Sequence, residues 1–208
     1  MKQNELFVIT ISRQLGSGGA YVGQQLANSL NAFYADREII RRAAKQLSVL
    51  EDDVEFRDEK NSSFWQTYLK SNSTGFPGGY IFPQVYIPTD RELFEAESQI
   101  LKHIAKERSA VIIGRCGNHI FCDHPNHLSI FLHADKAFRN DRIQKLYKIS
   151  AEAAEKMITK NDKERAQYNL TFTGKDWTDA RYYDISLDTS KFGLDESTEL
   201  ILKYIELN

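Results

Sequence analysis

ISRQLGSGGAYVG, residues 11–23, is the stretch that decides the fold. It continues the apolar, β-branched run LFVITIS (6–12), which is typical of a buried strand. After the glycines, Val22, Leu26 and Leu30 recur at every fourth position and predict an amphipathic helix. A strand that runs through a glycine-rich turn into a helix favours phosphate binding. Glycines let backbone amides converge on an anion, and the helix N-terminus carries a partial positive charge.

The motif departs from the common phosphate-binding loop, GxxxxGK[ST], in which the Lys reaches the terminal phosphates and the hydroxyl meets Mg²⁺. Arg13 stands at the first Gly of that pattern, Gly19 at the Lys and Ala20 at the hydroxyl residue. By pattern alone, a strand-to-helix turn without a ligand is as well supported as a phosphate site. The residues expected to hold nucleotide phosphates are Leu15, Gly16, Ser17, Gly18, Gly19 and Ala20.

The rest of the chain alternates strands and helices. A second short strand ends near Asp36, and further strands are expected at 109–115, 127–134 and 183–189. Helices are expected at about 37–47, from a Thr89/Glu92 capping box to about 108, after N-caps at Asp135 and Ser150, and at the C-terminus. This alternation predicts an α/β fold with a parallel sheet and helices on its faces.

The helix after Asp135 is expected to turn Phe138, Ile143 and Leu146 toward the core. We expect one domain over residues 1–208, since the length suits a single core. Within it we expect an insertion at about 51–108 and a lid at about 150–180.

The charge balance narrows the classes of partner. Of the 208 residues, 27 are Lys or Arg and 29 are Asp or Glu, which gives a formal net charge of −2. No overall basic field therefore recruits nucleic acid or a membrane surface. The apolar run near the N-terminus is too short for a signal peptide or a membrane span. We expect a cytoplasmic protein that meets anions through a local cluster.

Two cysteines and three histidines lie together in GRCGNHIFCDHPNH. A zinc site is the chemical alternative to consider, because thiolates and imidazoles are the ligands that zinc prefers. The spacing of Cys116 and Cys122 matches no familiar paired zinc pattern. We therefore predict two reduced thiols in a polar loop and no metal site there.

Taken in order, several segments resemble the cytidylate kinase-like family, a branch of the P-loop nucleoside monophosphate kinases. They are ITISRQLGSGGAYVGQQLA, FYADREII, VIIGRCGN, IFLHADKAFRNDRI, NDKERAQY and YYDISLDTSKFGLDE. The phosphate loop without lysine is itself a feature of that branch. The resemblance implies a P-loop NTPase fold with a five-stranded parallel sheet, and ATP-dependent transfer of a phosphoryl group with Mg²⁺ as the companion ion. The implied acceptor is a nucleoside monophosphate or another small phosphorylated or hydroxylated molecule.

On the donor side, we expect Arg13 to substitute in part for the missing Lys, because a guanidinium chelates phosphate oxygens in pairs. Packing of its stem on the sheet edge, with an ion pair to Asp36, is the alternative. Ser17 offers a hydroxyl to phosphate or metal. Asp36 is a candidate for hydrated magnesium or the acceptor, with Arg37 beside it, although an Asp after a strand is also a common helix cap.

Four more arginines belong to this scheme. Arg115 resembles the Arg that contacts the acceptor phosphate in cytidylate kinases, and an Arg at the mouth of a parallel sheet needs an anionic partner. Arg139 and Arg142 lie on one face of a predicted helix, and Arg165 resembles the Arg that the lid supplies. These three are expected to neutralise charge on the transferring group, a solvated charged face being the alternative.

The aromatic segment 51–88 occupies the place of the acceptor-binding domain of these kinases. Its rings suit base stacking, a small core or the interface of a homodimer equally well. Two further functions remain open at this stage. One is a nucleotide or anion sensor that binds without transfer, and the other is a module that docks a partner chain.

Overall fold

A computed structural model describes residues 5–36, 39–40 and 90–207. Five strands form one parallel sheet in the order β2-β3-β1-β4-β5. They are β1 (Val8–Arg13), β2 (Phe33–Ala35), β3 (Ala110–Ile113), β4 (His127–His133) and β5 (Ile185–Asp188). This confirms the α/β fold with a five-stranded parallel sheet. The central place of β1 brings the loop after it to the middle of the carboxyl edge.

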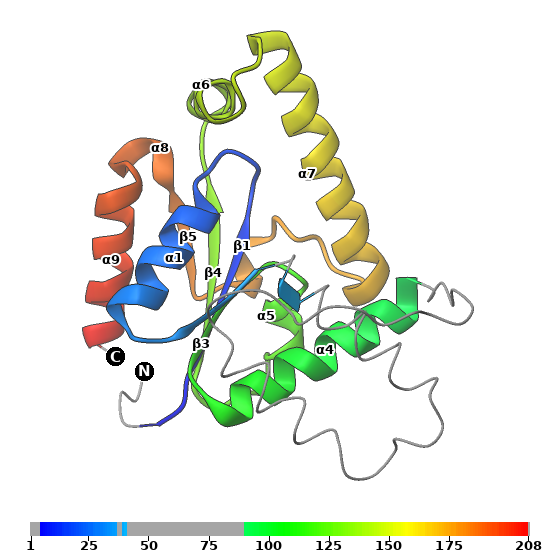
Figure 1. Cartoon of the computed structure of the whole chain (residues 1–208), viewed down its shortest axis with the longest axis vertical. Coiled ribbons are helices and arrows are strands. Elements are labelled where there is room, and N and C mark those ends of the chain that lie inside the picture. Colours follow the sequence, from blue (N-terminus) through cyan, green and yellow to red (C-terminus); the bar gives the residue numbers. More distant parts are fainter. Residues whose placement is uncertain (1–4, 37–38, 41–89, 208) are drawn as a thin grey trace, which may run out of the picture.

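Helices cover both faces of the sheet (Figure 1). The longer ones are α1 (Gly19–Ser29), α4 (Asp90–Glu107), α6 (Lys136–Tyr147), α7 (Ala151–Thr173) and α9 (Leu194–Leu207). Short turns complete the described chain: α5 (Gly117–Ile120), the 3₁₀ turn η2 (Ala180–Tyr182) and α8 (Thr189–Phe192). None of these three turns is expected from the sequence, because each is too short to show a period.

One face of the sheet packs against α1 and α9. Val22 and Leu26 of α1 and Ile201 of α9 join the inward residues of β1 in one buried cluster. The residues of β1 alternate between the two faces, and Val8, Ile9 and Ile11 are fully buried. Burial on both faces explains why this strand reads as a continuous apolar run.

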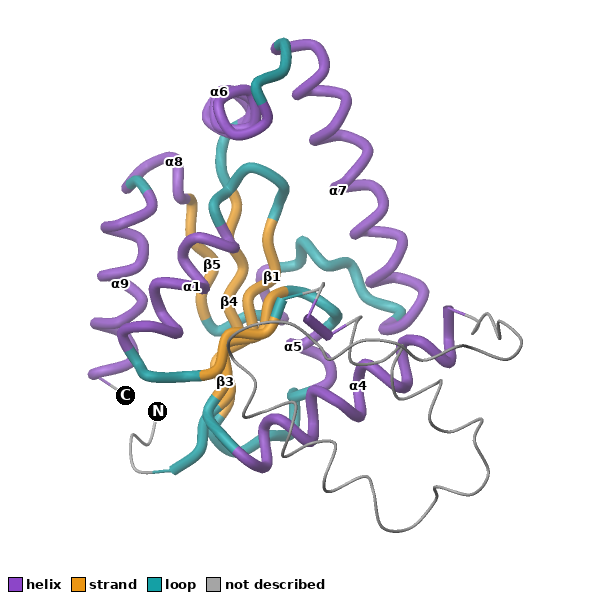
Figure 2. The backbone as a smooth tube through the Cα atoms, in the orientation of Figure 1, coloured by secondary structure: helices purple, strands orange, loops and turns teal. Residues whose placement is uncertain are grey.

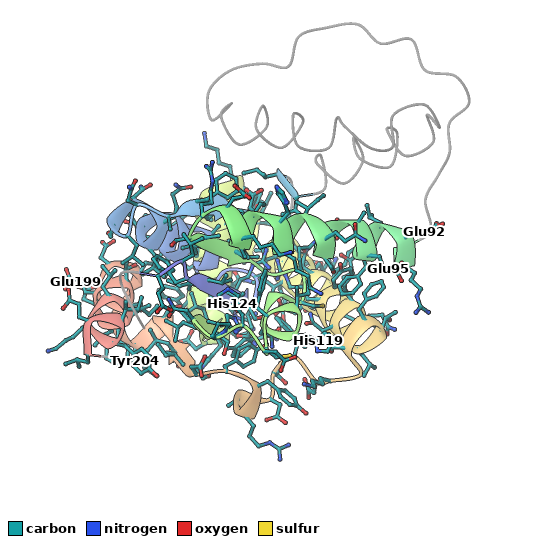
Figure 3. The ribbon with its side chains drawn as sticks, turned by 90° about the horizontal axis from the view of Figure 1, so that it is seen from below. Glu92, Glu95, His119, His124, Glu199 and Tyr204 are labelled. Atoms are coloured by element: carbon teal, nitrogen blue, oxygen red, sulfur yellow. The ribbon has the colours of Figure 1, made fainter. Side chains whose placement is uncertain are left out.

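The other face packs against α4 and α5. Ile100, Leu101 and Ile104 of α4 are fully buried and form a second cluster with Ile112 of β3. Seen from below, α4 and α9 lie on opposite sides of the molecule (Figure 3). Although α4 falls within the range expected for an insertion, its apolar side belongs to the core of the sheet.

Beyond the carboxyl edge, α6 and the first turns of α7 rise above the strands, and α7 then descends toward α4 (Figures 1 and 2). Both expected N-caps are confirmed: Asp135 accepts from Phe138 N at 2.7 Å and Ser150 from Ala153 N at 3.2 Å. The expected core position of Leu146 is wrong, since 59% of it is exposed. Ile143 is buried against Ala154 and Ile158 of α7 as expected, and Phe138 is half-buried.

Several expectations lie outside the described residues. They are the aromatic segment, the Thr89 cap, Arg37 and the helix at 37–47 apart from Ile39 and Ile40, which are helical. Among the helices that the structure describes, none has the length and apolarity to cross a membrane.

Candidate phosphate-binding site

The loop between β1 and α1 is shaped by two glycines in the left-handed region, Gly16 (φ 89°) and Gly18 (φ 83°). Gly18 is also the N-cap of α1, so the loop ends where the amides of the first helical turn point outward. An added Cβ at Gly16 would lie 2.9 Å from Cβ of Arg139 on α6. Glycine is therefore required at this position both by the backbone and by the close approach of α6.

Ser17 closes the loop from within. Its side chain is fully buried, and its hydroxyl lies 2.9 Å from the carbonyl oxygen of Gln14 and 3.0 Å from that of Leu132. The hydroxyl proton thus serves the main chain of the loop and of β4. The Ser17 amide also donates within the loop, to the Gln14 carbonyl oxygen at 3.3 Å, so both polar groups of Ser17 hold the loop together.

The loop is also held from the C-terminal segment. Thr189 is fully buried and donates its hydroxyl to the carbonyls of Ser17 (2.9 Å) and His133 (3.2 Å). Asp188 caps the following turn by accepting from Ser190 N at 3.0 Å. Thr189, the middle residue of the Asp188-Thr189-Ser190 triplet, therefore holds the phosphate loop through the Ser17 carbonyl group.

Asp162 of α7 joins the loop to both helices above it. One carboxylate oxygen accepts from Leu15 N at 2.8 Å, and the other lies 2.6 Å from Nη1 of Arg139. Nη1 of Arg165 lies 3.2 Å from the first of these oxygens. The structure thus brings together two of the arginines expected to neutralise phosphate and one of the expected loop amides. The sequence places Asp162 three residues before Arg165, but no role was predicted for Asp162 itself.

Arg142 belongs to the same helix as Arg139 but not to the Asp162 cluster. It is half-buried and makes no ion pair with any residue that the structure describes. Its charge is felt at Tyr21, where the hydrogen bond to Asp195 raises the hydroxyl pKa and Arg142 opposes the rise. Arg142 is therefore close enough to α1 for its charge to act on Tyr21.

Arg13 ends β1 and lies against two glycines. A Cβ added to Gly19 would lie 2.6 Å from Cγ of Arg13, and one added to Gly114 would collide with its Nη1. The aliphatic part of the Arg13 side chain therefore packs against the start of α1, and its guanidinium lies at the carboxyl end of β3. Burial raises the pKa of the Tyr34 hydroxyl, Asp36 adds to the rise and Arg13 opposes it, so both charges reach this ring.

Asp36 follows β2 and caps the next helical turn, with one carboxylate oxygen 3.0 Å from Ile39 N. This is the helix-cap role that the sequence left open. The expected neighbour of Asp36, Arg37, lies outside the described residues.

Arg115 has an anionic partner inside the protein. Its guanidinium forms an ion pair with Glu97 of α4, and both side chains are buried. The guanidinium carbon also lies 5.0 Å from the centre of the Tyr168 ring, whose hydroxyl is 3.4 Å from Glu97. The sequence signal for Glu97 was its position on the apolar face of α4, between Leu93 and Ile100.

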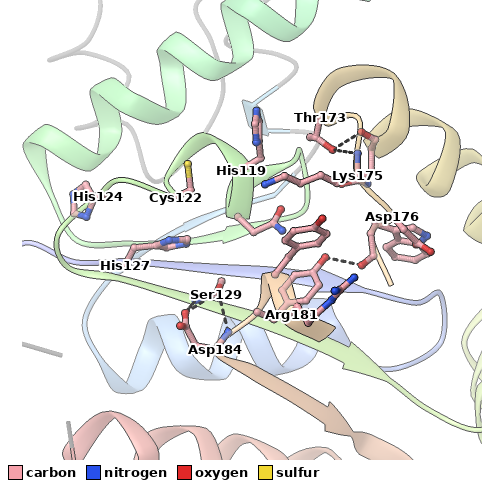
Figure 4. A pocket seen from close by; sticks show the side chains of 15 residues that line it. His119, Cys122, His124, His127, Ser129, Thr173, Lys175, Asp176, Arg181 and Asp184 are labelled. Carbon is pink, nitrogen blue, oxygen red and sulfur yellow. Dashed lines mark hydrogen bonds between the residues drawn. The ribbon is translucent and has the colours of Figure 1, made fainter. Parts of the chain in front are cut away.

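A cavity of about 310 Å³ lies away from the phosphate loop, between α5, the start of β4 and the segment after α7 (Figure 4). His119, His127 and Cys122 line it, but no three His, Cys, Asp or Glu side chains in the described chain are grouped to hold a metal. Burial lowers the pKa of His127 to about 4 and raises that of Cys116 to about 12. Both groups are therefore neutral at physiological pH.

Comparison with known proteins places the chain in a family. The sequence model of the cytidylate kinase-like family matches residues 8–191. The chain belongs to the cytidylate kinase-like family. It is 25% identical to the cytidylate kinases of two Saccharolobus islandicus strains over 201 residues, which is 96% of this chain and 91% of each relative.

Two solved structures show the same fold. An uncharacterized protein from Eubacterium ventriosum is 25% identical and has a TM-score of 0.73, covering 97% of this chain and 99% of its own. Shikimate kinase from Bacteroides thetaiotaomicron is 11% identical with a TM-score of 0.51, again over 97% and 99% of the two chains. Family membership supports a kinase-type phosphotransferase.

Proposed function

We propose that this protein is an ATP-dependent phosphotransferase that moves the γ-phosphoryl group of ATP to a nucleoside monophosphate or a similar small acceptor. The observation that carries the proposal is the Asp162 cluster. A carboxylate is held by a loop amide and two arginines, at the loop where a kinase of this fold holds its donor. Groups that hold a carboxylate in this way are suited to phosphate oxygens.

The donor is held mainly by backbone. The left-handed glycines and the open first turn of α1 supply amides and the positive end of a helix dipole. This arrangement fits a polyphosphate. For magnesium, the buried Ser17 hydroxyl is a poor ligand, whereas a carboxylate such as that of Asp36, at the carboxyl end of β2, suits a metal-bound water. Bound magnesium would supply charge neutralisation between the phosphates.

The acceptor belongs at the ends of β2 and β3, next to the loop. Asp36 lies at the first of these ends, and Arg115 follows the second. Because Glu97 already neutralises Arg115, this residue contributes position and hydrogen bonds rather than a full charge. Arg13 then supplies the cation nearest to an acceptor phosphate.

Transfer itself needs alignment, charge neutralisation and exclusion of water, and no general base. Arg139, Arg142 and Arg165 come from the two helices that rise above the loop. When phosphate oxygens enter, Asp162 shares or yields its arginines to them, and α7 shields the site. The positions of these side chains, rather than any covalent step, would set the rate.

The direct experiment measures ADP release by a coupled assay across a panel of nucleoside monophosphates, with Mg²⁺ and ATP. We expect turnover with at least one acceptor well above the ATPase rate without acceptor. Arg142→Ala serves as the matched variant, because its charge is placed for transfer and not for folding. Binding of ATP without turnover on any acceptor would contradict the proposal.

A further inference from the structure

Position 19, where the common loop carries Lys, is shaped by Arg13. The backbone of Gly19 is helical, so its conformation alone admits any residue. The obstacle is packing, because a Cβ there would lie 2.6 Å from Cγ and 2.7 Å from Cβ of Arg13. Side chains do not approach so closely. Arg13 and a lysine at position 19 therefore exclude one another.

A second glycine makes room for the other end of the same side chain. Gly114 follows β3 in the left-handed region, with φ 75°, and a Cβ there would run into Nη1 of Arg13. The glycine at the start of α1 thus admits the stem, and the glycine at the end of β3 admits the guanidinium. Neither position was singled out for this reason by the sequence.

We propose that Arg13 is the loop cation of this protein, and that Gly19 and Gly114 are positioning residues that make its place. The inference rests on the proposed function and deepens it. The common pattern has Gly at the position of Arg13 and Lys at the position of Gly19. The absence of the Lys and the presence of the Arg are therefore two parts of one exchange, in which the cation moves from position 19 to position 13. Either arrangement supplies one cation to the same small volume.

The location of the guanidinium defines which phosphate it meets. β3 lies between β1 and β2 in the sheet. The carboxyl end of β3 therefore lies between the donor loop, which follows β1, and Asp36, which follows β2 on the acceptor side. A lysine at position 19 would begin on α1, whereas the Arg13 guanidinium already stands at this boundary. It is therefore placed for the oxygens of the transferred phosphoryl group and of an acceptor phosphate.

A stability cycle tests the packing without any activity. Gly→Ala within a helix normally stabilises a protein. We expect Gly19→Ala to lower the melting temperature of the otherwise unchanged chain and to raise it when Arg13→Gly is also present. Arg13→Gly is used instead of Arg13→Ala, because the alanine Cβ would remain 2.7 Å from the new one. An equal effect of Gly19→Ala in both backgrounds would overturn the packing argument.

Gly174 provides the control for the second glycine. It also has a left-handed backbone, with φ 67°, but nothing lies within 4 Å of its added Cβ. Gly174→Ala therefore reports the backbone cost alone. Gly114→Ala should lower the melting temperature further, and Arg13→Gly should abolish the difference. If Gly114→Ala still lowers the melting temperature more than Gly174→Ala does when Arg13→Gly is present, the positioning role of Gly114 is contradicted.

An exchange of the two residues tests the functional part. Arg13→Gly should lower the transfer rate at least tenfold, and Arg13→Gly combined with Gly19→Lys should recover most of it. A well-folded double variant no faster than Arg13→Gly would overturn the assignment, as would full activity of Arg13→Gly.

If the unchanged protein transfers to no acceptor, the proposed function fails. The same variants are then compared by the shift of melting temperature that tripolyphosphate causes, where recovery by the exchange still supports Arg13 and its absence contradicts it.

Discussion

Asp162 is the residue at which the phosphate loop meets the helices above it. Its carboxylate pairs with Arg139, whose side chain is 10% exposed, and accepts from the Leu15 amide. Removal of one partner from such a cluster leaves a mostly buried charge without its counter-ion. The carboxylate therefore has a structural role in the absence of a nucleotide, besides its effect on the arginines.

Asp162→Ala should lower the free energy of unfolding by about 1–3 kcal/mol. Urea unfolding at neutral pH measures the change. Glu152→Gln is the matched control on the same helix, because its ion pair with Lys156 is exposed and worth at most about 0.5 kcal/mol. If the two variants lower the free energy of unfolding equally, Asp162 has no structural role beyond that of an exposed ion pair.

His127 makes the stability depend on pH. Burial lowers the pKa of its imidazole to about 4 from 6.5, and Nε2 lies 2.8 Å from the hydroxyl oxygen of Thr10. The unfolded chain takes up this proton below pH 6.5 but the folded chain only near pH 4, so stability falls as the pH drops between these values. The loss should be of the order of 2–3 kcal/mol. Urea midpoints at pH 7 and pH 4.5 check it, and His127→Gln should remove most of the difference.

The two cysteines should differ in reactivity. Burial raises the pKa of the Cys116 thiol to about 12, whereas Cys122 is exposed. Because the thiolate is the nucleophile, iodoacetamide at pH 8 should modify Cys122 and spare Cys116 until the protein unfolds. Mass spectrometry of labelled peptides gives the answer. Rapid labelling of Cys116 in the folded protein would contradict its burial.

At the scale of single residues, the sequence indicates which types gather at the site but not how they pair. Arg115 was expected to contact an acceptor phosphate. In the structure it pairs with Glu97, on a helix that precedes it in the chain. The position of Glu97 on an apolar helix face indicates that this carboxylate needs a buried partner. Which residue that partner is depends on where α4 lies against β3, and no local sequence pattern contains this information.

At the scale of elements, α6 carries two arginines with different surroundings. Arg139 is buried and paired with Asp162, whereas Arg142 is half-buried and has no ion pair within the described chain. Arg142→Ala should leave the melting temperature unchanged and lower kcat/KM about 100-fold. Arg139→Ala should lower both. The ADP-release assay and a melting curve separate the two cases, and Lys145→Ala, an exposed position on the same helix, should change neither.

Elements with strong local signals could be predicted well. The N-caps Asp135 and Ser150 start their helices where expected, since capping depends on a few neighbouring residues. On α6, Ile143 is buried as predicted, whereas Leu146 was placed wrongly. That helix packs on α7 rather than on the sheet, in a small cluster that includes Ile143 but not Leu146.

At the scale of the whole molecule, the alternation of strands and helices predicts a parallel sheet, and the resemblance adds the number of strands. The order β2-β3-β1-β4-β5 comes from the structure. This order explains the site, because it gathers the loop after β1, the glycine after β3 and Asp36 after β2 at one edge. Residues distant in sequence meet there, as Thr189 and Ser17 do.

The measurement that tests the central claim most directly is an NMR titration of the ¹⁵N-labelled protein with ATP and Mg²⁺. The claim is that backbone amides at the start of α1, helped by arginines, hold a polyphosphate without the loop lysine. It predicts saturable shifts of the amide signals of residues 15–20, and no comparable shifts along the 310 Å³ cavity. Loop signals that stay unchanged at millimolar nucleotide would contradict it.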